Sequence, residues 1–221
     1  MTRSHRGARA QKSPRMAAVI VLALALVTSY GTAYAQARSG DVARPPYTTA
    51  DARFMQGMIA HHAQALDMTA LLPARTMRED MRLLAQRIEV SQKDEIALMQ
   101  RWLTARHERV PNLDDHHVAM PGMSMSDTHM DKMLMPGMLT VEQLSELAKT
   151  KDAEFDRLFL QDMIRHHEGA LLMVRDLLAT NGAAQEPEIF QFASDIDADQ
   201  HAEIMRMRAL LTHPSLQRDP K

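Results

Sequence analysis

The chain has 221 residues with no cysteine, 19 methionines and 11 histidines, a length that suits one domain or two small ones. The lack of cysteine excludes a disulfide framework, a thiolate zinc site, an iron–sulfur cluster and a cysteine nucleophile. The formal charge is −2, and because five cations but no acid lie in residues 1–35, the rest of the chain would carry −7. Such an acidic chain is poorly suited to nucleic acid, so we expect no nucleic-acid partner.

The N-terminus has the order of a secretory signal peptide. Five cations in residues 1–15 precede an apolar run over residues 16–27, and a small-residue cleavage pattern ends at Ala35. The apolar run is shorter than the roughly 20 residues that a membrane-spanning helix needs. We therefore expect residues 1–35 to be a signal peptide and the mature chain to be periplasmic or secreted, without membrane contact. A leader that was kept would instead act as an anchor.

Residues 48–108 are predicted to form a first helical hairpin. Its first helix covers about residues 51–72, has apolar residues at the three-and-four spacing of one helix face, and ends at Pro73. Its second helix covers about residues 77–107 and carries a similar apolar stripe. Both helices are therefore expected to bury one face.

Residues 109–139 are predicted to be an irregular loop, because proline and glycine interrupt any helix there. The segment holds seven methionines, three histidines and two copies of Met-Pro-Gly-Met. A plain linker is the simpler interpretation, but exposed loops favour polar residues, and exposed methionine is prone to oxidation. We favour a mobile loop that collects copper through soft sulfur donors. Its candidate ligands are His116, His117, Met120, Met123, Met125, His129 and Met130.

Residues 140–212 are predicted to form a second helical hairpin. A capping box at Thr140 starts a short helix, a third long helix covers about residues 152–180 and stops at Gly182, and a fourth begins near Pro187. No part of the hairpin alternates between apolar and polar residues as a strand would. This half of the chain is therefore helical as well.

The two hairpins are copies of one pattern. Residues 54–62 match residues 159–167 at an offset of 105, and residues 85–103 match residues 193–211 at an offset of 108. A repeated pair of helix-length blocks indicates a duplicated hairpin. Because two amphipathic hairpins can bury their apolar faces only against each other, residues 48–212 are expected to form one all-α domain, a four-helix bundle.

Each copy carries Met-x-x-His-His, with a further methionine seven residues after the first histidine. Neighbouring residues differ by about 100° around a helix, so at most one histidine of each pair should point straight into the core. In a two-fold bundle the two pairs would face each other. Methionine is often core filler, but four histidines on apolar faces would need partners. Imidazole and thioether suit copper, and the thioether favours Cu(I). The candidate ligands are Met58, His61, His62, Met68, Met163, His166, His167 and Met173.

Polar residues also recur within the apolar stripes of the second and fourth helices, at Gln92 with Glu95 and at Gln200 with Glu203. The two glutamates could be metal ligands themselves. We prefer the interpretation that they hydrogen-bond the histidines and fix their tautomers.

The paired motif at residues 54–62 and 155–170, with the Met-Pro-Gly-Met that begins at Met135, resembles the domain-of-unknown-function 305 (DUF305) family over about residues 48–211. Members of that family are ferritin-like, and they include exported copper-binding proteins. The resemblance implies a periplasmic four-helix bundle that binds copper through the matching methionines and histidines.

The predicted function is therefore an exported metal-binding protein, not an enzyme, that sequesters or transfers copper. Its ligand would be Cu(I) rather than Cu(II), and a copper-handling protein would be its partner. A ferritin-like di-iron oxidase is one alternative, but that site uses Glu-x-x-His, and no glutamate of the chain has a histidine three residues later. A pH-sensing interaction module, with histidines that titrate near pH 6, is the other.

Overall fold

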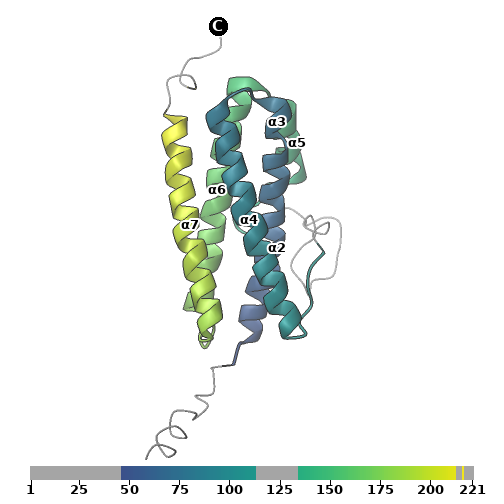
Figure 1. Ribbon diagram of the computed structural model, residues 1–221, viewed down its shortest axis with the longest axis vertical. Coiled ribbons are helices and arrows are strands. Elements are labelled where there is room, and N and C mark those ends of the chain that lie inside the picture. The colour runs from purple at the N-terminus through teal and green to yellow at the C-terminus, as the bar shows by residue number, and fades with distance from the viewer. Residues whose placement is uncertain (1–45, 113–133, 213–215, 217–221) are drawn as a thin grey trace, which may run out of the picture. The chain divides into compact units, whose positions relative to one another are not determined.

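The computed structural model describes residues 46–112, 134–212 and 216. Within these residues the chain forms six helices and no strand, which confirms the predicted all-α class (Figure 1). The helices are α2 (Thr49–Ala70), α3 (Leu72–Arg75), α4 (Glu79–Ala105), α5 (Val141–Lys149), α6 (Asp152–Ala179) and α7 (Pro187–Leu211). No helix of this described part is both long enough and apolar enough to cross a membrane. The predicted signal peptide lies outside the described residues.

The ends of the helices follow the capping signals of the sequence. Thr48 and Asp51 form a capping box at the start of α2, and Thr140 caps α5 in the same way. The first helix ends at Ala70 rather than at residue 72, because Pro73 has no N–H to continue the helical hydrogen bonds. Pro73 instead occupies the first turn of the short α3, where a missing N–H costs nothing.

The long helices pair as the internal repeat predicts. α2 packs along α4, α6 packs along α7, and the two hairpins meet mainly through α2 and α6 (Figure 1). Two apolar clusters fill the interior. One lies around Phe54, Trp102 and Phe192, and the other around Met81, Phe155 and Phe159. Burial of these large side chains supplies most of the driving force for the bundle.

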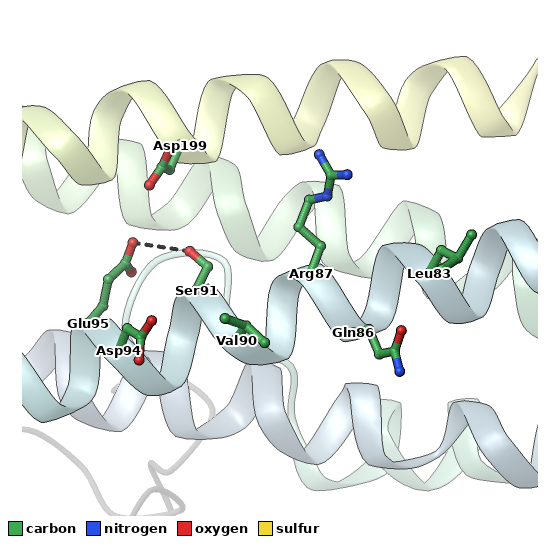
Figure 2. A pocket seen from close by; sticks show the side chains of 8 residues that line it. All are labelled: Leu83, Gln86, Arg87, Val90, Ser91, Asp94, Glu95 and Asp199. Carbon is green, nitrogen blue, oxygen red and sulfur yellow. Dashed lines mark hydrogen bonds between the residues drawn. The ribbon is translucent and has the colours of Figure 1, made fainter.

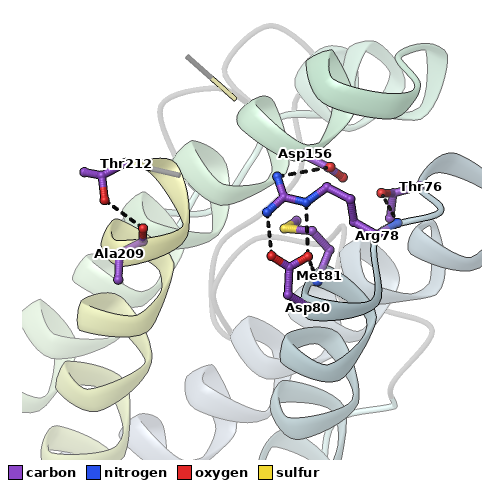
Figure 3. Close-up of polar contacts among 7 residues, drawn as sticks. All are labelled: Thr76, Arg78, Asp80, Met81, Asp156, Ala209 and Thr212. Carbon is purple, nitrogen blue, oxygen red and sulfur yellow. Dashed lines mark hydrogen bonds and ion pairs between the residues drawn. The ribbon is translucent and has the colours of Figure 1, made fainter. Parts of the chain in front are cut away.

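Each hairpin also contacts the turn of the other through a buried aspartate. Asp51, which is fully buried, accepts a hydrogen bond of 2.7 Å from the backbone N–H of Ala184, between α6 and α7. Asp156 is the repeat counterpart of Asp51, and its carboxylate lies 3.8 Å from the guanidinium of Arg78 at the start of α4 (Figure 3). Burial raises the pKa of Asp156, and the nearby Arg78 opposes that rise. Each of these two contacts links the first helix of one hairpin to the turn of the other hairpin.

Replacing Asp51 by alanine should lower the free energy of unfolding by about 2–3 kcal/mol, because the N–H groups of Thr48 and Ala184 would lose their acceptor. Urea denaturation followed by circular dichroism measures the change. Asp176→Ala is the matched control, since Asp176 is an exposed residue of α6. Equal losses in the two variants would contradict this role of Asp51.

Candidate metal site

A layer of polar side chains divides the core in two. It lies at the same level on all four long helices, between the two apolar clusters, and nearly all of its members are buried. The layer consists of His61 and His62 of α2, Gln92 and Glu95 of α4, His166 and His167 of α6, and Gln200 and Glu203 of α7. Polar groups in such surroundings have little water to bond with, so their partners within the protein decide their state.

The histidines of the two copies meet across the α2–α6 interface. The rings of His61 and His166 lie 3.9 Å apart between centroids at an interplanar angle of 39°. Within each helix the neighbouring rings are 6.3 Å apart. The prediction that the two pairs face each other is thus confirmed.

Both histidines of each pair are buried, although only His61 and His166 meet across the α2–α6 interface. His61, His62 and His167 have no exposed surface, and His166 has 1%. The reason is that α2 packs against both α4 and α6, while α6 packs against both α2 and α7. Each helix therefore buries an arc wide enough for two residues that lie about 100° apart.

The hydrogen bonds of three histidines define their tautomers. His61 Nε2 lies 2.9 Å from the carbonyl oxygen of Pro136, and His167 Nε2 lies 2.6 Å from Glu203 Oε2. His62 Nε2 contacts Glu95 Oε2 in the same way. Carbonyl and carboxylate oxygens only accept, so each Nε2 carries the proton that it donates. None of these three Nδ1 atoms has a hydrogen-bond partner.

The fourth histidine differs in which atom is free. His166 Nε2, rather than Nδ1, is the buried ring nitrogen without a partner. Burial lowers the pKa of His61 to about 3, and burial together with the neighbouring imidazoles lowers the pKa of His166 well below its usual value. Both rings are therefore neutral at physiological pH, and neutral imidazole is the form that binds metal.

The carboxylates occupy the position that the sequence suggested. Glu95 and Glu203 are related by the repeat, and they bond His62 and His167, which the repeat also relates. A carboxylate behind a histidine fixes the orientation of the ring and raises the basicity of its free nitrogen. The preferred interpretation, that the glutamates hold the histidines, agrees with these contacts.

An open groove of about 740 Å³ leads to this layer between α4 and α7 (Figure 2). Glu95 lines the groove, where its Oε1 accepts a hydrogen bond of 3.3 Å from Ser91, while its Oε2 contacts His62 inside. Asp199 projects from α7 on the opposite side of the groove (Figure 2). Burial and the nearby carboxylates of Glu95 and Glu203 raise the pKa of Asp199. The groove is lined by the three carboxylates of Asp94, Glu95 and Asp199 and by the one cation Arg87, so its net negative charge favours the approach of cations.

The end of the predicted Met/His loop is not an exposed loop. Met135 and Met138 are buried, with 8% and 7% exposure, and residues 135–139 pack against α2 and α6. We call residues 135–139 the strap. Its anchors are the hydrogen bond from His61 to Pro136 and a double hydrogen bond, of 2.9 and 2.7 Å, between the Gln64 side chain and the backbone of Leu139.

Two glycines allow this close packing. Gly137 has φ of +80°, which glycine adopts without strain, and it lies against α6 at Gly169. A Cβ on Gly169 would stand 1.9 Å from the carbonyl oxygen of Pro136. The sequence predicts a mobile loop for residues 109–139, which include the Met-Pro-Gly-Met at residues 135–138. The signal that this prediction missed is the glycine at 169, where the first copy of the repeat has Gln64.

The predicted thioether ligands lie on both sides of the histidine layer. Met58 belongs to one apolar cluster and Met68 and Met163 to the other, all fully buried, while Met173 is half-buried. Within residues 46–112 and 134–212, no three His, Asp or Glu side chains stand close enough together to hold an ion. The remaining candidates lie outside the described residues: His116, His117, Met120, Met123, Met125, His129 and Met130.

The chain matches a known protein family over most of its length. A family model described as "Domain of unknown function (DUF305)" matches residues 51–211, and the chain belongs to this family. It is similar to a DUF305 fragment from Deinococcus radiodurans, with 31% identity, a TM-score of 0.61, and 76% of this chain and 98% of that chain covered. It is also similar to a DUF305 protein from Streptomyces coelicolor, with 25% identity, a TM-score of 0.60, and 78% of this chain and 98% of that chain covered. No match was found among curated proteins.

One group of similar structures has metal bound. CopM in its Cu(II)-bound form has 28% identity to this chain and a TM-score of 0.54, with 72% of this chain and 94% of CopM covered. CopM has also been solved in Cu(I)-bound and Ag-bound forms.

Gly169→Ala should detach the strap and lower the free energy of unfolding by about 3 kcal/mol, because the added Cβ would collide with the Pro136 backbone. The loss would exceed the roughly 1 kcal/mol that alanine gains in helix propensity. Urea denaturation and hydrogen exchange of the Leu139 amide measure the effect. Gly57→Ala is the control, because there the nearest atom, at 3.2 Å, belongs to a flexible methionine side chain. A slow-exchanging Leu139 amide in Gly169→Ala would refute the prediction.

Proposed function

We propose that this DUF305 protein is an exported copper-binding protein that sequesters or transfers copper and has no catalytic activity of its own. The observation that carries the proposal is the set of four buried histidine nitrogens without a hydrogen-bond partner. A buried nitrogen without a partner costs free energy, and a bound metal ion would recover that cost. The similarity to CopM, which binds copper and silver, supports the same conclusion.

The donor set favours a soft ion. In the proposal the nitrogen ligands come from His61, His62, His166 and His167, and thioether ligands come from the methionines of the same motifs, Met58, Met68, Met163 and Met173. Imidazole and thioether together suit copper, and the uncharged thioethers favour Cu(I) over Cu(II). Glu95 and Glu203 would keep His62 and His167 in the tautomers that leave Nδ1 free.

The leader pattern of residues 1–35 supports export, and we infer a periplasmic or secreted location from it. In that compartment a chain without cysteine cannot lose its ligands to disulfide formation. A copper-handling protein is the partner that a carrier would need. Residues 113–133 would add further donors, through the three histidines and the methionines named above.

The two alternatives have less support. A di-iron oxidase would need Glu-x-x-His, which the sequence does not contain. A module that switches near pH 6 would need histidines with a pKa near 6, whereas burial lowers the pKa of His61 to about 3. Binding of a metal ion is the function that the buried, neutral histidines favour.

The double variant His61→Phe/His166→Phe should weaken the tightest Cu(I) site by about 100-fold or more, because it removes two nitrogens but keeps the ring volume in the core. Competition with a Cu(I) chelator measures the affinity, and circular dichroism verifies the helices. His201→Phe is the matched control, since His201 is an exposed histidine of α7. Unchanged Cu(I) affinity in a folded double variant would exclude the histidine layer as the site.

Deleting residues 118–133 should lower the number of Cu(I) ions bound per chain without unfolding the bundle, because it removes methionines and a histidine but spares the strap. Equilibrium dialysis followed by metal analysis gives the stoichiometry. Replacing the same residues by a Gly/Ser linker of equal length controls for chain connectivity. If the linker variant binds as many ions as the wild-type protein, these residues are not ligands.

A further inference from the structure

Two thioethers converge on one glycine beside the histidine layer. Gly57 is buried in α2, one helical turn before His61. The point where a Cβ on Gly57 would stand lies 3.2 Å from Met135 Sδ of the strap and 3.5 Å from the methyl carbon of Met173 in α6. Three elements therefore meet here, and two of them bring a methionine side chain to the same place.

This convergence occurs on only one side of the α2–α6 interface. The repeat counterpart of Gly57 is Asp162, which forms a 2.9 Å ion pair with Arg165. The counterpart of Met173 is Met68, which is completely buried in an apolar cluster, whereas Met173 is half-buried. The side of the interface that carries the strap thus has a glycine where the equivalent position on the other side has a charged side chain. The methionine on the strap side, Met173, is also partly exposed, whereas Met68 on the other side is buried.

The surroundings point to a ligand rather than to simple packing. Met135 is bonded to Pro136, whose carbonyl oxygen accepts the hydrogen bond from His61. Met173 lies two helical turns after His166 on the same helix. The buried rings of His61 and His166 each have a nitrogen without a partner. Two sulfur donors and two free nitrogen donors therefore belong to directly connected parts of the structure.

We propose that Met135 and Met173 form a thioether site for a soft monovalent cation, Cu(I) or Ag(I), at Gly57 on the strap side of the histidine layer. The inference rests on the proposed function, because it pairs Met173, one of the thioether ligands proposed above, with Met135 in a binding site for the same class of ion. Uncharged thioethers select soft cations over Zn²⁺, Mg²⁺ and Ca²⁺. Met173 is half-buried, so an ion can approach the site from solvent, and the absence of a side chain at Gly57 lets both methionine side chains come close to α2 at the same point.

The experiment is an Ag(I) titration of the protein labelled with ¹³C at its methionine methyl groups. Ag(I) is diamagnetic, and a methyl next to a coordinating sulfur changes its chemical shift. The methyl signals of Met135 and Met173, assigned by the variants Met135→Leu and Met173→Leu, should shift together at the same Ag(I) equivalent. In either leucine variant the signal of the other methionine should no longer shift at that equivalent.

Matched variants separate binding from packing. Leucine is close to methionine in volume, and Met81→Leu changes a buried methionine of the other apolar cluster, so it should leave both shifts intact. Gly57→Ala places a methyl group at the meeting point and should weaken the shared response, with Met135 and Met173 still present.

Two outcomes overturn the inference, and they are distinguishable. If Ag(I) binds and shifts other methionine signals but not those of Met135 and Met173, this site is wrong and the proposed function stands. If Ag(I) and Cu(I) do not bind the wild-type protein at all, the proposed function fails, and this inference fails with it.

Discussion

A buried imidazole is tolerable only if its N–H finds an acceptor, and this requirement organises the middle of the bundle. Four histidines lie in a core whose two ends are apolar. Three of the histidines have an acceptor: a carboxylate on α4, a carboxylate on α7, and the Pro136 carbonyl of the strap. Each acceptor uses one ring nitrogen and leaves the other without a partner. In the proposed function, the same hydrogen bonds that stabilise the layer would orient its histidines as ligands.

The duplication explains the two outer histidine–glutamate pairs, which are alike. It does not explain the two inner histidines, whose surroundings differ. The His62–Glu95 and His167–Glu203 pairs are repeat copies with the same geometry. The inner rings differ, because the strap lies on only one side and bonds only His61. Two copies of one hairpin thus make a site with two unlike sides, an acidic groove between α4 and α7 and a strap that bears methionines. In the proposed function, the two sides would give different surroundings to a cation that enters or leaves the layer.

Membership of the DUF305 family and similarity to CopM agree with this arrangement. The chain shares the helical fold with those structures at 25–31% identity, a level at which side-chain detail must be read from each protein. In this protein the side-chain arrangement differs on the two sides of the histidine layer, with the groove on one side and the strap on the other. The glycine at 169 matters because it lets the backbone of the strap approach α6 where a side chain would exclude it, whereas the glycine at 57 meets only the side chains of Met135 and Met173.

Periodicity, caps and the repeat were enough to predict the helices, their pairing and the meeting of the two histidine pairs, because these depend on apolar spacing and on local backbone chemistry. The contact of Glu95 with His62 was also foreseeable, since the repeat carries both residues. The burial of both histidines in each pair depended on how many helices surround α2 and α6, which spacing along one helix does not encode. The strap depended on packing between segments 75 residues apart. Only the tertiary structure decided these features, because long-range contacts override the turn and loop preferences of the local sequence.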